Sequence, residues 1–110
     1  MAKYIMIYRL AQPFDMAQLP KDKIVQAMSE WGEWVGRIGS VVVDRGDAFK
    51  IGGKTTDGKE VNMTDNLTSG YSVVEAKDFD EALSYAQDCP VIKNGGRVEI
   101  YEAFGTDTIR

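Results

Sequence analysis

The sequence contains no histidine. This absence removes the general base that most enzymes use near neutral pH, together with the Ser-His and Cys-His pairs of nucleophilic catalysis. It also removes the ligand on which most zinc and non-haem iron sites depend. Any catalysis by this chain must therefore use Asp, Glu, Tyr, Lys or Arg, and we expect neither a metal nor another cofactor.

Cysteine, clustered basic residues and long apolar runs are also scarce. The one cysteine, Cys89, cannot form an internal disulfide, which fits a reducing cytoplasm. The 13 Lys and Arg residues form no basic stripe and the net charge is −4, so we expect no nucleic-acid partner. No apolar run is long enough to span a bilayer, and the opening segment lacks the features of a signal peptide, so we expect no membrane association.

The composition, with 44% hydrophobic and 27% charged residues, predicts one globular domain over residues 1–110. Alternating apolar residues predict strands, and apolar residues at spacings of three and four predict helices. We predict strands at 3–10, 40–44, 70–76 and 97–104, and helices at 20–38 and 78–90. A tight hairpin is predicted around Asp57-Gly58, between the second and third strands.

Strand, helix, strand, hairpin, strand, helix, strand is the order of an α+β, ferredoxin-like βαββαβ fold with a β-hairpin insertion. Two helices cover only one face of such a sheet. The first strand, "KYIMIYRL", is nevertheless apolar on both faces, and an uncovered apolar face on a small domain indicates a partner. Pairing two sheets face to face predicts a homodimer.

The helix at 20–38 carries one apolar stripe, made of Ile24, Met28, Trp31, Val35 and Ile38. Trp34 lies at the edge of this stripe, where it could belong to the core, an interface or a pocket wall. Gly32 and Gly36 weaken the interior of the helix, and their spacing would permit close packing.

The alternation of side chains along a strand decides which residues face the helices. The aliphatic residues are expected to do so, namely Ile5, Ile7, Val74, Val98 and Ile100. The averted face then collects Tyr4, Met6, Tyr8, Tyr71, Val73, Glu75, Arg97, Glu99 and Tyr101. Aromatic residues mixed with a few charges line many small-molecule pockets, and they also suit a polar dimer interface. Both readings stay open, with Arg9 or Arg97 orienting an anionic or carbonyl ligand.

Two carboxylates are candidates for catalysis. A Glu99 side chain in a cavity walled by Tyr and Met would have its pKa raised by desolvation and could act as a general acid or base. An ion pair with Arg45 or Arg97 is the alternative. Asp65 lies between two strand-like segments in "VNMTDNLTSGY", where Asp-Asn followed by Ser-Gly also favours a turn. We favour the turn role for Asp65 and regard Glu99 as the better candidate.

Several motifs, spread over nearly the whole chain, resemble the YCII-related family, and within it the group of DGPF-domain proteins. They are "KYIMIYRL", a helix ending near "WGEWVGRIGSV", a Thr-Asp step, "DFDEALSYAQDCP" and a closing "GGRVEI". The resemblance implies a ferredoxin-like dimeric α+β barrel. Some members of the family are thought to be enzymes that use a His-Asp pair in a cavity, whereas others are attached to sigma-factor domains.

This chain departs from the family pattern at two places. It has no histidine, so the His-Asp pair cannot be present, and "DNLT" stands where the signature has Asp-Gly-Pro-Phe. Asp65 matches the Asp of that signature, Glu99 matches a Glu in the last strand, and Tyr8 matches an aromatic in the first. Cys89 falls on a Cys before Pro, where a small buried residue is the expected role.

Two functions of different classes follow. In the first, the protein is a homodimer that binds a small metabolite in a cavity between sheets and performs proton transfer through a carboxylate. In the alternative, it is a non-catalytic interaction or accessory module that acts through its dimer surface. Cofactor-free monooxygenase or isomerase chemistry is a third reading, by analogy of fold alone.

Overall fold

The computed structural model describes residues 1–105; residues 106–110 of the expected domain lie outside the described part. An antiparallel four-stranded sheet forms the body, in the order β2-β5-β1-β6. Its strands are β1 (Ala2–Arg9), β2 (Val42–Ala48), β5 (Thr68–Ala76) and β6 (Arg97–Glu102). This order, with a helical crossover after β1 and another after β5, confirms the predicted ferredoxin-like α+β fold.

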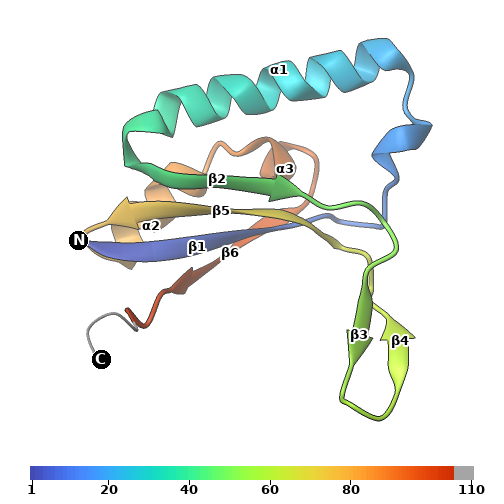
Figure 1. Cartoon of the computed structure of the whole chain (residues 1–110). Helices are drawn as coiled ribbons and strands as arrows, with labels where there is room; N and C mark the ends of the chain where they lie inside the picture. The colour runs from blue at the N-terminus through green and yellow to red at the C-terminus, as the bar shows by residue number, and fades with distance from the viewer. Residues whose placement is uncertain (106–110) are drawn as a thin grey trace.

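The helices are α1 (Lys21–Ile38), α2 (Phe79–Ala86) and α3 (Pro90–Lys93), with 3-10 turns at Met16–Gln18 and Gly39–Val41. They lie on one side of the sheet and leave its other face uncovered (Figure 1). Helix α2 begins after Asp78, whose carboxylate accepts a hydrogen bond of 2.9 Å from the Glu81 backbone N–H; Asp followed three residues later by Glu is a pattern of the capping-box type. Pro90 does not end this helix but begins α3, where its missing N–H costs nothing.

The first strand faces the helices with its aromatic side, which corrects the expected orientation. Tyr4, Met6 and Tyr8 are buried at 2%, 0% and 5% exposure, whereas Ile5 and Ile7 point to the uncovered face. The register explains this choice, because Met6 and Tyr8 lie beside Ser72 and Gly70 of β5. Those small residues leave room on the helical side for bulky neighbours.

Aromatic rings fill that room. The Tyr8 ring packs edge to face against Trp31 and Trp34, with centroid distances of 4.8 and 6.0 Å, and Tyr4 packs in the same way against Phe79 at 5.0 Å. Trp34 is 1% exposed, and its indole N–H donates to the Tyr85 carbonyl at 3.0 Å. Trp34 is therefore a core residue, one of the three roles that its position in the stripe allowed.

The apolar stripe of α1 packs against the core as predicted at Trp31, Val35 and Ile38, with one exception and one addition. Met28 is 65% exposed, whereas Trp34 is buried. Nothing lies within 4 Å of a Cβ built on Gly32 or Gly36, so the described chain makes no use of the close packing that their spacing would permit.

Strand β2 forms an irregular edge of the sheet. Its pairing with β5 shifts register between Val42 and Asp44, and again between Asp44 and Asp47. Gly46 has a φ of +72°, and a Cβ at this position would collide with the backbone carbonyl of Tyr71. Only glycine therefore suits this bulge without strain.

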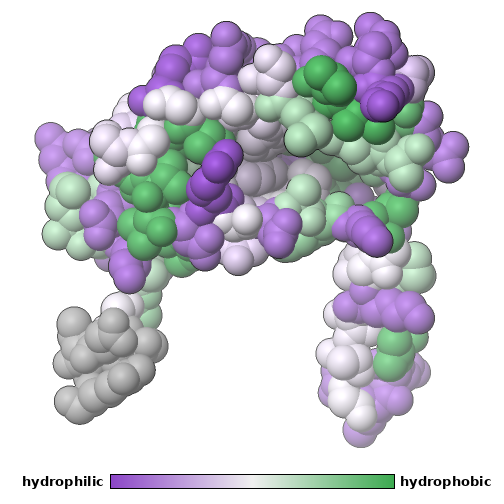
Figure 2. Space-filling model, turned by 45° about the horizontal axis from the view of Figure 1, so that its top comes forward, coloured by the Kyte–Doolittle hydropathy of each residue, from purple (hydrophilic) through white to green (hydrophobic). Residues whose placement is uncertain are grey.

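A second, two-stranded sheet projects from the body as the predicted hairpin. It consists of β3 (Lys54–Thr56) and β4 (Val61–Met63). We call residues 54–63 the arm. The arm extends on the side of the sheet opposite α1, and in Figure 2 it stands clear of the body with hydrophobic and hydrophilic residues along its length (Figures 1 and 2). All of its residues are exposed.

Candidate functional site

The uncovered face of the sheet brings most of the predicted site residues together. The register of β1 with β5 and β6 places Ile7 between Tyr71 and Glu99, and Ile5 between Val73 and Tyr101. These side chains therefore share one face of the sheet. Charged residues flank this apolar centre, namely Lys3, Glu75, Arg9 and Arg97. We call these ten residues the open face.

Tyr4 and Tyr8 lie on the opposite side, under the helices. The Tyr8 hydroxyl donates to Ser72 Oγ at 2.7 Å, and Ser72 Oγ donates to the Arg45 carbonyl at 2.7 Å. Burial raises the pKa of Tyr8 to about 12. The Tyr4 hydroxyl donates to Glu102 at 3.1 Å. Neither tyrosine adds a polar group to the open face.

Arg9 is fixed at one end of the open face. Its guanidinium donates to Asp65 at 2.7 and 3.3 Å and to Thr68 Oγ1 at 2.8 Å. The pKa of Arg9 is raised, first by these bonds to Asp65 and further by the nearby Glu99 and Tyr101. Its Nε is buried and has no hydrogen-bond partner among residues 1–105, which leaves this arginine with unused donor capacity.

Asp65 shapes the turn that leads into β5. Its carboxylate accepts a bond of 2.9 Å from the Leu67 backbone N–H, and the intervening Asn66 adopts a φ of 59°. Such an Asx turn is typical of Asp-Asn sequences. The hydrogen bonds from Arg9 and from the Leu67 N–H hold the pKa of Asp65 below its usual value. An exposed, ion-paired carboxylate of this kind suits positioning better than proton abstraction near neutral pH.

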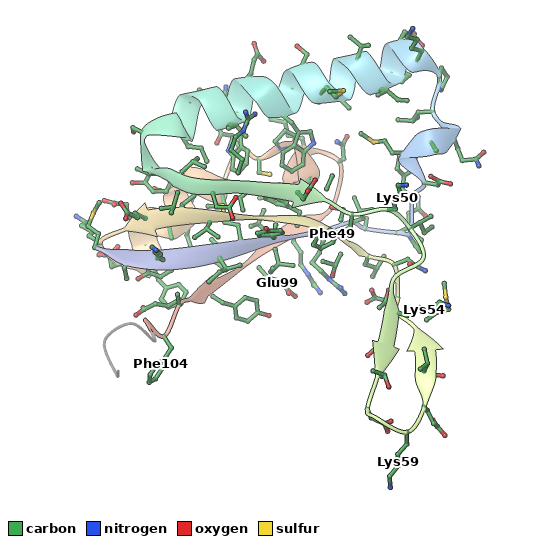
Figure 3. The ribbon with its side chains drawn as sticks, viewed as in Figure 1. Phe49, Lys50, Lys54, Lys59, Glu99 and Phe104 are labelled. Atoms are coloured by element: carbon green, nitrogen blue, oxygen red, sulfur yellow. The ribbon has the colours of Figure 1, made fainter. Side chains whose placement is uncertain are left out.

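Glu99 occupies the middle of the open face. It projects from the side of the sheet on which the arm extends (Figure 3). The Tyr101 hydroxyl donates to it at 3.2 Å. Within the described residues Glu99 forms no ion pair with Arg45 or Arg97, so its second oxygen is available to a ligand.

Two cavities share Leu10, which follows the end of β1, and Arg9 lines the smaller of the two. The smaller, of about 210 Å³, is lined by Arg9, Leu10, Ala11, Leu67, Gly95, Gly96 and Arg97. The larger, of about 300 Å³, is lined by Leu10, Phe14, Phe49, Lys50, Ile51, Gly53, Thr64, Asn66, Thr68 and Ser69. The larger volume is at the lower end of the roughly 300–1,000 Å³ usual for small-molecule sites.

The sequence patterns did not predict the residues that line the larger cavity as site residues. Phe14, Phe49 and Ile51 lie in loops, so no strand or helix periodicity points to them. Their hydrophobic side chains in segments otherwise rich in polar residues, glycine and proline were the available signal.

Cys89 has a structural role. Its side chain is fully buried, and burial raises the pKa of its thiol to about 12. A thiol of this kind is a poor nucleophile, in agreement with the small buried residue expected at this position.

In the described part of the chain, no group of three or more His, Cys, Asp or Glu side chains is arranged to hold a metal ion. In residues 1–105 no helix combines the length and the apolar character needed to cross a membrane.

The chain is thus an antiparallel sheet with helices on one face, and its other face has an apolar centre flanked by charged residues. The model of the YCII-related domain family matches residues 5–104, and the chain belongs to this family. Its fold is also similar to that of 5-chloro-2-hydroxyhydroquinone dehydrochlorinase (TftG) from Burkholderia phenoliruptrix, solved in complex with 2,5-dihydroxybenzoquinone. That similarity has a TM-score of 0.55 and 18% identity, and it covers 89% of this chain and 90% of the other. A comparison with curated proteins finds no match.

Proposed function

We propose that this protein is a homodimer that binds a small, oxygen-rich metabolite between two facing sheets. The observation that carries the proposal is the open face, whose apolar centre is left uncovered by the helices and flanked by both signs of charge. A two-fold interface must be self-complementary, and a face holding Lys3, Arg9 and Arg97 beside Glu75 and Glu99 meets this requirement.

The ligand site lies at the Arg9 end of this face. Arg9 and Arg97 are cross-strand neighbours that line one cavity, and like charges so placed repel each other unless anions offset them; Asp65 offsets the charge of Arg9 alone. Within residues 1–105 Arg97 has no ion-pair partner. The pair therefore suits a ligand with carboxylate, phenolate or enolate oxygens.

Glu99 is the proton acceptor in this proposal. Asp65 is committed to Arg9 and to its turn, whereas Glu99 has an oxygen available beside the arginines and the Tyr101 hydroxyl. Tyr71 and Tyr101 supply aromatic surface for a planar ligand. The fold similarity to the dehydrochlorinase suggests a ring compound with several oxygens as the first ligand to test.

Sedimentation velocity tests the homodimer. Ile7→Asp places a charge in the centre of the open face and should weaken dimerisation by at least about tenfold, because burying an isoleucine stabilises by roughly 1.5–3 kcal/mol. Val25→Asp is the matched control, since Val25 is 60% exposed on α1. A wild-type protein that stays monomeric at all concentrations would refute the homodimer.

Calorimetric titration with 2,5-dihydroxybenzoquinone tests the ligand site. Arg97→Met should weaken binding by about tenfold or more, consistent with the roughly 1.5–3 kcal/mol of a charged hydrogen bond. Lys3→Met, at the other end of the open face, should leave binding unchanged. A dimer that binds neither this quinone nor other small oxyanions would instead support the interaction module.

A further inference from the structure

The arm carries hydrophobic side chains on one of its sides. Because Met63 pairs with Lys54 and Val61 with Thr56, Met63 and Val61 share that side, whereas Asn62 points to the other. Val61 and Met63 are 66% and 58% exposed. A two-stranded hairpin standing alone in water is only marginally stable, so the exposed apolar side calls for a partner surface.

The place of the arm indicates where that surface lies. The arm descends from one end of the sheet on the side away from α1, and Phe104 lies beyond β6 toward the opposite end (Figures 1 and 3). Tyr101 and Phe104 are 56% and 80% exposed there. In a two-fold dimer with facing open faces, the two ends of the sheet can exchange places between the copies. The arm of one copy then lies at the Phe104 end of the other.

We infer that the arm is a clasp for a second copy of this chain, in which Val61 and Met63 pack on Tyr101 and Phe104 of the partner subunit. This inference rests on the homodimer of the proposed function. A methionine thioether against aromatic rings is a favourable and adaptable contact. Each copy supplies one arm and receives one, so the contact forms twice in a closed pair.

Charge supports the same pairing. Lys54 shares the apolar side of the arm and Lys59 lies near its tip, whereas the strand β6 presents Glu99 on the open face (Figure 3). Opposite charges placed in this way fix orientation and speed encounter more than they add affinity. High salt should therefore slow association of the dimer more than it accelerates dissociation.

Sedimentation velocity on arm variants tests the clasp. Met63→Asp should weaken dimerisation by about tenfold or more, whereas Asn62→Asp, its neighbour on the other side of the arm, should leave the dimer unchanged. Both side chains are exposed, so neither change should disturb the fold of the subunit. Equal dimer affinities for the two variants would overturn the clasp while leaving the face-to-face dimer intact, and a monomeric wild-type protein would overturn both.

Disulfide trapping supplies an independent readout. A chain with Met63→Cys and Phe104→Cys should form covalent dimers under mild oxidation, and the single native cysteine is buried and does not compete. The control, Asn62→Cys with Phe104→Cys, should cross-link at least about tenfold more slowly, because its thiol points away. Equal rates for the two pairs would contradict the inferred contact.

Discussion

The stability of this protein should respond to alkaline pH through one tyrosine, Tyr8. In Tyr8→Phe the ring remains while the buried hydroxyl that donates to Ser72 at 2.7 Å is lost. Losing such a bond should lower the free energy of unfolding by about 0.5–1.5 kcal/mol near neutral pH. Ser72 keeps its own bond to the Arg45 carbonyl, so the loss stays confined to one interaction.

The penalty of Tyr8→Phe should then shrink as the pH rises. Burial raises the pKa of Tyr8 from 10.0 to about 12. Between these values the unfolded chain releases the proton and the folded chain keeps it, so the stability that Tyr8 contributes is complete below pH 10 and is lost toward pH 12. At pH 11 the free energy of unfolding of the wild-type protein should therefore be lower by about 1.4 kcal/mol than at neutral pH through Tyr8 alone. Tyr8→Phe lacks this decrease.

Urea unfolding followed by far-ultraviolet circular dichroism at pH 8 and pH 11 measures this difference. Other groups that titrate in this range are common to both proteins and cancel in the comparison. Gly32→Ala is the control, because it changes no titratable group and should shift the stability profile without changing its shape. An identical penalty for Tyr8→Phe at both pH values would refute the reasoning from burial.

Three further predictions concern a glycine pair, the Arg9 ion pair and the thiol. Gly46→Ala should lower the free energy of unfolding by about 3 kcal/mol or more, because the new Cβ would collide with the Tyr71 carbonyl. Gly32→Ala, at an uncrowded position inside α1, should raise it by about 0.5–1 kcal/mol. Asp65→Asn should destabilise modestly at pH 7 and less at pH 2. The pKa of Asp65 is lowered in the folded chain, so the stabilisation by its charge is lost as the pH falls through that pKa; thermal melts at both pH values decide this. Iodoacetamide should label Cys89 only after unfolding, as mass spectrometry would show, and labelling of the native protein would contradict its burial.

The order of the elements could be predicted because each has a local signal. Alternation in "KYIMIYRL", the three-and-four spacing before Gly39, and Asp78 followed by Glu81 each specify an element without reference to the rest of the chain. The face on which β1 places its tyrosines had no such signal. A strand that is apolar on both sides is equally consistent with either phase, and the phase was decided by the small residues Gly70 and Ser72 of a strand far away in sequence.

The candidate site was predicted only in part for a similar reason. Alternation along β5 and β6 places Tyr71 and Glu99 on the open face, because Val74 and Ile100 mark the buried side of their strands. The bond from Arg9 to Asp65 depends instead on the register of β1 with β5 and on a turn with a left-handed residue. Long-range pairing of this kind is specified by the assembled sheet and not by a local pattern.

The bulged strand β2 has a consequence for how this chain can aggregate. A regular edge strand offers a row of free N–H and C=O groups on which further strands can add without limit. Two register shifts, together with Asp44 and Asp47, interrupt that row in β2. The addition of further strands at this edge, and with it lateral growth into fibrils, is therefore disfavoured.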